Sequence, residues 1–222
     1  GSTDPVLQDI EATTRTWEGH ATQNAVSYRA ARDFRTEMHA LLQRGLLAPY
    51  TNGTPAEGLG SGINAYEGWL WPLVSGQPEN LLPAAFGSWN ELFEYAVKAS
   101  LQRVEESGRD PYTSTWGEAN VAAICHQFAL FVPEWVGRYL CMAPDQLAGD
   151  DHVPRVARPD FGASQRTIVS PGHEELGIMH LPGGQSGHPL SPYWGAGHED
   201  WVNGEASSYL PGQTVYTLTV GP

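Results

Sequence analysis

The stretch LPGGQSGHPLSPYWGAGHEDW, from Leu181 to Trp201, is the most informative part of this sequence. It places Ser186 between glycines and follows it with two histidines and two acids. A serine, a histidine and an acid are the three side chains of a common nucleophilic mechanism. The stretch is therefore either part of a catalytic site or a glycine-rich turn with a structural role.

Ser186 does not fit the nucleophile elbow of the serine hydrolases. That turn needs the pattern G-x-S-x-G, because the backbones approach too closely for side chains. Here His188 occupies the position of the last glycine, and Pro189 and Pro192 prevent the long helix that follows an elbow. We expect the Ser186 hydroxyl to stabilise a tight glycine loop. A separate hydrolase that uses Ser186 or Ser2 is kept as an alternative.

The histidines of this region do not have the spacing of a metal site. Four histidines and four acids lie between positions 173 and 200, namely His173, His180, His188, His198, Glu174, Glu175, Glu199 and Asp200. No H-E-x-x-H pattern occurs among them, and glycine and proline interrupt the spacings. The run from Gly149 to His152 lacks the alternating acids of a calcium loop. We therefore expect no metal site, and the glycines fit no nucleotide-binding pattern.

The composition is that of a globular chain with an acidic balance. Its 222 residues are enough for a sizeable core, and 12 basic against 25 acidic residues give a formal charge of −13. Nucleic acids and anionic lipids both need basic patches, so we expect neither as a partner. No apolar run is long enough for a membrane span, and residues 1–15 contain no apolar core of a signal peptide.

Two cysteines and eight tryptophans are the other notable residues. Cys125 and Cys141 permit one disulfide, but they lack C-x-x-C spacing, and we expect two buried free thiols. The tryptophans, together with 25 glycines and 17 prolines, indicate many ordered loops held by large side chains. A stand-alone module that binds a sugar or a hydrophobic ligand with exposed tryptophans is a second alternative.

Hydrophobic periodicity predicts helices in the first part of the chain. The clearest helix covers 27–47, and a second runs from about 89 to 107 with Ser88 as its N-cap. Short helical pieces are expected within 118–128 and 134–140. Residues 51–62 have the composition of a loop.

The last part of the chain has the patterns of strands. Residues 165–170 and 176–181 predict a β-hairpin, and the alternation in 214–220 (TVYTLTV) is the strongest strand pattern of the chain. Helices first and antiparallel strands last indicate an α+β fold. Residues 1–144 are expected to be mainly helical, and residues 145–222 are expected to be strand and loop.

Several segments together resemble the C-terminal part of the large subunit of the penicillin acylase family. The strongest likeness begins with GQSGHP (184–189) and continues with SPY (191–193) and the W-x-x-G of Trp201 and Gly204. Upstream, the matching segments follow in the family's order and are WEG (17–19) with the helix after it, TWGE (115–118), the segment of His126, and FGASQR (161–166). The likeness therefore spans nearly the whole chain.

The sequence departs from the family pattern at two places. Gln127 stands where the family has a proline, and Tyr193–His198 (YWGAGH) replaces a segment with tyrosine, aspartate and glutamine. These departures indicate a divergent branch. They leave the identity of the substrate open.

The resemblance implies a part of an N-terminal-nucleophile amidohydrolase with a four-layer αββα sandwich. In this family the first residue of the large subunit is the catalytic serine, and its own α-amine acts as the base. Residues 1–222 would then be one C-terminal fragment that holds no catalytic residue and needs no cofactor. Gly1 has no hydroxyl, and Ser2 is followed by residues that do not match the family's start.

The resemblance also implies partners and a compartment. The chain would complete the core sheets together with the small subunit and the N-terminal part of the large subunit. It would line the cleft for an acylated small molecule, such as a penicillin or an acyl-homoserine lactone, through Trp69, Trp71 and the hairpin near residue 180. A periplasmic or secreted location is expected from the family.

Overall fold

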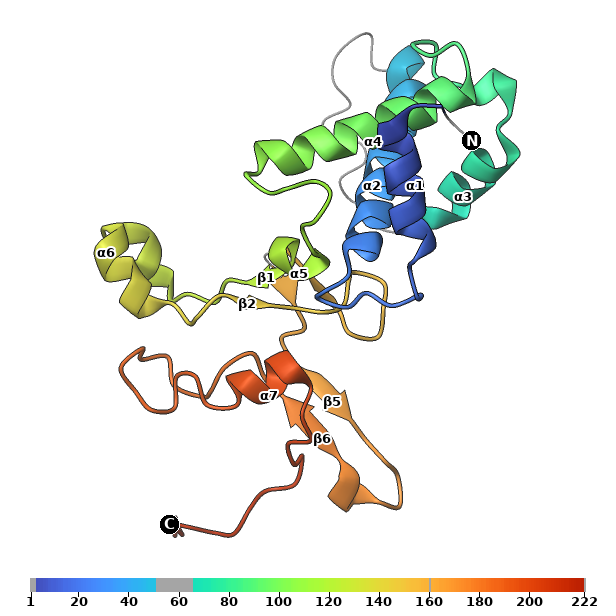
Figure 1. Cartoon of the computed structure of the whole chain (residues 1–222). Coiled ribbons are helices and arrows are strands. Elements are labelled where there is room, and N and C mark those ends of the chain that lie inside the picture. The colour runs from blue at the N-terminus through green and yellow to red at the C-terminus, as the bar shows by residue number, and fades with distance from the viewer. Residues whose placement is uncertain (1–2, 51–65, 160, 222) are drawn as a thin grey trace. The chain divides into compact units, whose positions relative to one another are not determined.

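The computed structural model describes residues 3–50, 66–159 and 161–221 (Figure 1). The chain forms two compact units, Gly1–Trp116 and Gly117–Pro222. The first unit is helical, and the second combines short helices with antiparallel strand pairs, so the fold class is α+β. The predicted loop at 51–62 lies outside the described residues. That residues 1–222 form one fragment of a larger subunit stays a prediction.

The first unit is built from helices. Its elements are α1 (Pro5–Arg15), α2 (Val26–Leu47), the 3-10 helix η1 (Ala48–Tyr50), α3 (Glu67–Gly76), the 3-10 helix η2 (Glu79–Leu81) and α4 (Trp89–Glu106). The two long helices predicted from periodicity are confirmed as α2 and α4. Over the part of the chain that the structure describes, no helix is both long enough and apolar enough to cross a membrane.

The ends of α4 and α1 follow from local sequence. The Ser88 hydroxyl accepts a hydrogen bond from the Glu91 N–H at 3.2 Å, and the Glu91 carboxylate accepts one from the Gly87 N–H at 2.7 Å. These bonds satisfy backbone donors that have no partner inside the helix. At α1, the Asp4 carboxylate accepts from Val6 N–H at 3.0 Å, with Pro5 in the first turn. Periodicity did not predict α1.

The core of the first unit lies between α2, α3 and α4. Its buried members are Met38, Leu41, Leu42, Leu70, Trp89, Leu92 and Ala96. Six of them come from the two long helices α2 and α4, and Leu70 comes from α3. Gly45 of α2 allows a close approach, because a Cβ there would lie 2.6 Å from Cβ of Pro83.

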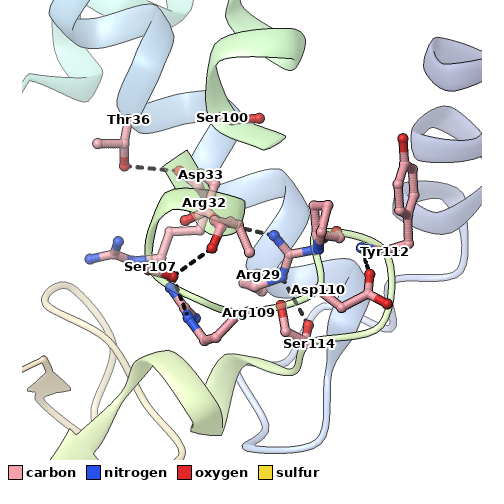
Figure 2. A network of polar contacts seen from close by, with 12 residues as sticks. Arg29, Arg32, Asp33, Thr36, Ser100, Ser107, Arg109, Asp110, Tyr112 and Ser114 are labelled. Atoms are coloured by element: carbon pink, nitrogen blue, oxygen red, sulfur yellow. Dashed lines mark hydrogen bonds and ion pairs between the residues drawn. The ribbon is translucent and has the colours of Figure 1, made fainter. Parts of the chain in front are cut away.

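A buried arginine fixes the loop that follows α4 to the first turn of α2 (Figure 2). The Arg29 guanidinium is almost fully buried and donates to the carbonyl oxygens of Ser114, at 2.9 Å, and Pro111. It also pairs with Asp33 at 3.1 Å. Burial raises the pKa of the Asp33 carboxyl, and the charge of Arg29 opposes this effect. The carbonyl partners indicate a structural role for this arginine.

His39 makes the stability of the first unit depend on pH. Its ring stacks on Tyr66 with centroids 3.8 Å apart, and its Nε2 is buried without a hydrogen-bond partner among the described residues. Burial, followed by the charge of Arg35, lowers the pKa of His39 from its ordinary value of 6.5. The unfolded chain therefore takes up this proton more readily, so stability is full above that value and falls as the pH drops below it.

Replacing His39 by Phe is expected to remove this part of the pH dependence, because phenylalanine keeps the stacking on Tyr66 and cannot be protonated. Urea unfolding at about pH 7.5 and about pH 5 measures the effect as a smaller loss of stability in His39→Phe than in the wild type. His152→Phe, at an exposed position of the second unit, is the control. An equal loss in His39→Phe and wild type would contradict the prediction.

The second unit consists of short elements joined by long ordered loops. They are α5 (Trp116–Ala119), which begins at the unit boundary, β1 (Val121–Ala122), η3 (Gln127–Phe131), α6 (Glu134–Gly137), η4 (Arg138–Leu140), β2 (Asp145–Gln146), β3 (Ala157–Arg158), β4 (Phe161–Gly162), β5 (Arg166–Ile168), η5 (Glu174–Leu176), β6 (Ile178–His180) and α7 (His198–Asn203). The helical pieces expected within 134–140 are confirmed. Within 118–128 the prediction is partly wrong, because β1 interrupts it.

The strands form three antiparallel pairs, β1 with β2, β3 with β4, and β5 with β6. The last pair is the predicted hairpin, with Arg166 opposite His180 and Ile168 opposite Ile178. The chain returns along the other edge of β6, where Met179 N–H donates to Ser207 O at 3.2 Å. The hairpin therefore has a third extended segment beside it.

Trp201 of α7 is the centre of the core of the second unit. It is 3% exposed and packs with Ala122, Leu147 and Ala157. Its Nε1 donates to Ala163 O at 2.9 Å, and its ring lies so close to Gly162 that a Cβ there would be 2.7 Å away. Trp201 thus joins α7 to the β3–β4 pair.

The expectation of two free thiols is wrong, because Cys125 and Cys141 form a disulfide. The two cysteines face each other in an antiparallel bridge. On either side of them, His126 N–H donates to Leu140 O and Met142 N–H donates to Ile124 O, both at 2.8 Å. This ladder brings the two cysteines together, although the sequence contains no short cysteine motif that predicts the pairing.

The strand predicted at 214–220 does not form. These residues are exposed and have no secondary structure, and no backbone hydrogen bond from them to another described segment is present. A strand needs a neighbouring strand to satisfy its N–H and C=O groups. The alternation in this segment therefore does not produce a strand within the described chain.

Candidate functional site

The glycine turn that begins at Leu181 is held by close backbone contacts. Gly184 N–H donates to Trp194 O at 2.8 Å. A Cβ on Gly184 would lie 1.8 Å from Tyr193 O, and one on Gly183 would lie 2.6 Å from Cε of Met142. Only glycine fits at 184, where a Cβ would collide with backbone, whereas at 183 a Cβ would require the flexible Met142 side chain to move. The turn is therefore a packed structural element with a fixed path.

Ser186 contributes to this turn through its hydroxyl, as the sequence predicted. Its Oγ accepts a hydrogen bond from the backbone N–H of His188 at 3.1 Å. The His188 imidazole is turned to the following residues, where its Nδ1 accepts from Leu190 N–H at 3.1 Å. Serine and histidine are close in sequence, but their side chains do not form the hydrogen bond of a nucleophile and its base.

His198 links three parts of the second unit. Its side chain is buried, its Nε2 lies 3.0 Å from Oδ2 of Asp145, and its Nδ1 lies 2.5 Å from Pro182 O. The ring therefore connects α7 with β2 and with the start of the glycine turn. Both of its nitrogens are used in these contacts.

His180 is buried in a second set of polar contacts. Its Nδ1 lies 3.1 Å from Nη1 of Arg166, and its Nε2 lies 2.5 Å from Glu205 O. Since arginine can only donate and a carbonyl can only accept, Nδ1 is the acceptor and Nε2 carries the proton. Arg166 also donates to Trp201 O at 3.1 Å, and burial lowers its pKa. These contacts fix the hairpin to α7.

The four histidines do not converge on one point. His180 and His198 are buried in separate sets of contacts, whereas His173 and His188 are exposed. Among residues 3–50, 66–159 and 161–221, no group of three or more histidine, cysteine or acidic side chains has the arrangement of a metal site.

A hollow of about 350 Å³ lies beside the glycine turn. Residues of β6, the turn and the start of α7 line it together with Ser207 and Ser208. The Ser207 hydroxyl donates to Met179 O at 2.9 Å, and the Ser208 hydroxyl contacts Leu210 O at 3.1 Å. Both hydroxyls thus hold backbone carbonyls. The hollow offers the carboxylate of Asp200 but no serine paired with a basic side chain.

The two tryptophans expected to line a substrate cleft differ in their exposure to solvent. Trp69 is partly buried against the core of the first unit, whereas Trp71 is 69% exposed. Their role in a cleft stays a prediction. Ser2, the other serine of the hydrolase alternative, lies outside the described residues.

The comparison with known families identifies the class of this protein. The model of the penicillin amidase family matches residues 7–211, which is most of the chain. The chain therefore belongs to the penicillin amidase family. No curated protein matches it.

Some of these contacts could not be read from the sequence. The pairing of Asp145 with His198 joins residues far apart in the chain, and neither belongs to a recognisable motif. The sequence indicates a role for Arg166 only weakly, because this residue ends the FGASQR segment on which the family likeness partly rests. The structural roles of the glycines and of Ser186 in the turn were the ones that the sequence indicated most clearly.

Proposed function

We propose that this chain is the C-terminal part of the large subunit of a penicillin acylase-type amidohydrolase, and that it contributes structure rather than the nucleophile. The observation that carries the proposal is the glycine turn. It is the segment most typical of the family, and the hydroxyls of its two serines, Ser186 and Ser191, accept hydrogen bonds from backbone N–H groups of the turn. The family match over residues 7–211 supports the amidohydrolase class.

The proposed reaction is hydrolysis of an amide bond through an acyl-enzyme. A serine hydroxyl at the start of the large subunit attacks the amide carbonyl, and the α-amine of the same residue accepts its proton. The amine product leaves, and water then hydrolyses the ester. In this scheme the present chain completes the αββα sandwich and one wall of the cleft for a penicillin or an acyl-homoserine lactone.

The disulfide supports a periplasmic or secreted location for the enzyme. Bridges such as Cys125–Cys141 form and persist in oxidising compartments and are rare in the cytosol. The exposed segment 214–220 supports assembly with the other parts of the acylase. Its alternation of apolar and threonine side chains suits a strand whose partner comes from elsewhere.

Co-expression tests this proposal. The chain is produced with a second polypeptide that carries the small subunit and the N-terminal part of the large subunit of an acylase of this family. Amide hydrolysis is followed with chromogenic acyl anilides. We expect activity only when both polypeptides are present. Replacing the N-terminal serine of the second polypeptide by Ala should abolish it, whereas Ser186→Ala in this chain should leave most of it.

The opposite pattern would sink the proposal. Hydrolysis by the present chain alone, abolished by Ser186→Ala or Ser2→Ala, would make it an independent hydrolase. A saturable change of tryptophan fluorescence with a sugar, without any complementation, would favour the binding module with exposed tryptophans.

A further inference from the structure

The outer edge of strand β5 is open within the part of the chain that the structure describes. β5 has β6 on one side only, whereas β6 has β5 on one side and the segment of Ser207 and Tyr209 on the other. Between residues 165–169 and the described segments other than β6, no backbone hydrogen bond is present. The strands of the second unit therefore end at β5 with one unpaired edge.

The far side of β6 shows which of its backbone groups are used there. Met179 N–H donates to Ser207 O at 3.2 Å. Tyr209 N–H donates to Gly177 O at 2.8 Å. In an antiparallel strand, the backbone groups of successive residues point alternately to its two sides. The backbone groups of Ile178, which lies between Gly177 and Met179, therefore point to β5.

The register of the hairpin then determines which groups of β5 point outward. Ile178 lies opposite Ile168, so the N–H and C=O of Ile168 point to β6. By the same alternation, the N–H and C=O of Thr167 point to the outer edge. Thr167 thus presents one backbone donor and one backbone acceptor that no other described strand uses.

The sequence of this edge lacks the usual protection against pairing. Natural sheets guard their edges with lysine, proline or other charged side chains. Residues 165–169 (QRTIV) contain no lysine or proline, and their only charged residue, Arg166, donates to Trp201 O at 3.1 Å. Ile168 and Val169 are 51% and 61% exposed. An open edge of this kind is a template for a strand from elsewhere.

The same chain contains a strand-like segment without a strand beside it. In TVYTLTV (214–220), Tyr216, Leu218 and Val220 share one face, and threonines occupy most of the other. The segment has no charged residue, glycine or proline, which is typical of segments that pair through their backbone. Its residues are exposed, and no backbone hydrogen bond joins it to another described segment. The chain therefore carries both an open edge and a strand that could fill one.

The connection to this segment is too short for pairing with β5 of the same copy. Tyr209 lies on the far side of β6, so the chain would have to cross β6 and then β5 to reach the outer edge. Residues 210–213 (LPGQ) form the whole connection. A connection that crosses over a sheet takes about a dozen residues or more. The segment that fills this edge therefore comes from another molecule.

The charges of the two pairing elements are compatible with a second copy as the donor. Each chain has a formal charge of −13, but the repulsion between exposed charges reaches only about 8 Å at physiological salt. Neither 165–169 nor 214–220 contains an acidic residue. Their pairing therefore places no like charges of these two elements opposite each other.

We propose that two copies of this chain exchange their 214–220 segments, and that each segment adds as a strand to the outer edge of β5 in the other copy. Each joint satisfies the outward N–H and C=O of Thr167 and covers Ile168 and Val169. Because both copies donate and accept, the exchange closes after two chains and does not continue into a filament. This pairing concerns the chain by itself and does not rest on the function proposed above.

Sedimentation and hydrogen exchange of the full chain test the exchange directly. At about 0.15 M salt we expect a dimer that dissociates on dilution. The Thr167 amide should be protected in the dimer and exposed after dilution, whereas the Ile168 amide, which faces β6, should be protected in both states. A chain that stays monomeric up to about 500 µM would overturn the proposal. A dimer with an unprotected Thr167 amide would do the same, as would protection of 214–220 that does not depend on concentration.

Thr167→Pro tests the edge of β5. Proline has no N–H, and it is tolerated in an edge strand where the N–H faces outward, so the hairpin should keep its own hydrogen bonds. We expect the dissociation constant of the dimer to rise at least about tenfold, because each of the two joints loses a hydrogen bond. Thr167→Val keeps the N–H and should dimerise like the wild type.

The double variant Thr217→Pro/Leu218→Pro tests the exchanged segment. In either register one of these two consecutive N–H groups points to β5, so the double variant should weaken the dimer by a similar factor. Thr217→Val/Leu218→Ile keeps both N–H groups and the strand preference, and it should leave the dimer intact. The melting temperature of the dilute double variant should equal that of the dilute wild type, because 214–220 has no backbone partner within its own described chain.

Mixing the two defective variants distinguishes the exchange from any other contact between copies. Thr167→Pro keeps an intact segment, and Thr217→Pro/Leu218→Pro keeps an intact edge. Each should be monomeric alone, and their mixture should form a one-to-one dimer through the single intact joint. A wild type that dimerises while the mixture does not would overturn the proposal. If Thr167→Pro lowers the melting temperature, the segment variant decides alone, and an unchanged dimer of that variant would overturn the proposal.

Discussion

Trp201→Ala is expected to lower the free energy of unfolding of the second unit by about 3–5 kcal/mol. The side chain is 3% exposed, and its ring packs on Gly162 and Leu147. Truncation leaves a cavity between α7 and the strands, and it also leaves Ala163 O without the indole N–H that it accepts. Urea unfolding measures the loss, and hydrogen exchange of the β6 amides shows whether it arises in this unit.

Trp135→Ala is the control for this substitution. Trp135 lies in α6 of the same unit and is 68% exposed, so its truncation should change stability by about 0.5 kcal/mol or less. A loss of similar size in both variants would mean that Trp201 is not the centre of this core. Both variants lose one indole ring. The difference between their free energies of unfolding therefore reports the packing of Trp201.

The helices that could be predicted from the sequence are those whose signal is local. The stripe of Met38, Leu41 and Leu42, and the Ser88 cap, determine α2 and α4 within the segment itself. The hairpin between 165 and 181 also has its two strands next to each other in the chain. For these elements, tertiary packing agrees with the local pattern, so pattern and structure coincide.

The segment 214–220 shows the limit of the same reasoning. Its alternation fits a strand, but a strand depends on a neighbour, which the alternation does not specify. The wrong prediction of two free thiols has the same cause. Whether Cys125 meets Cys141 depends on the backbone ladder around them, and that ladder is made between residues on both sides of a helical excursion. Non-local pairing therefore explains both errors.

The same distinction between local and non-local contacts applies to the candidate site. The glycines at 183 and 184 and the hydroxyl of Ser186 act within one turn, so their roles could be predicted. The contact between Asp145 and His198, and the two hydrogen bonds of Arg166, come together only through the fold. The closeness of Ser186 and His188 in the sequence raised the question of a catalytic pair, the sequence pattern argued against it, and in the structure each side chain accepts a hydrogen bond from a backbone N–H of its own turn.

Removal of the disulfide is expected to cost about 3 kcal/mol of stability, the typical value for a bridge that closes a loop of about 15 residues. The bridge ties the ends of the excursion η3–α6–η4, which exposes Phe128, Leu130, Phe131, Trp135 and Tyr139. Without it, two hydrogen bonds of the neighbouring ladder would have to hold these ends together. The double variant Cys125→Ser/Cys141→Ser is compared with the wild type by urea unfolding.

A second comparison separates the bridge from the substitutions. The wild type under reducing conditions should lose as much stability as the double variant, and the double variant itself should not respond to the reductant. A wild type that keeps its urea midpoint on reduction would contradict the prediction. Because the cytosol keeps thiols reduced, the same stability difference predicts that the chain accumulates better when it is exported to an oxidising compartment. Comparing the yield of the chain in the two compartments therefore tests the proposed location through the stability that the disulfide contributes.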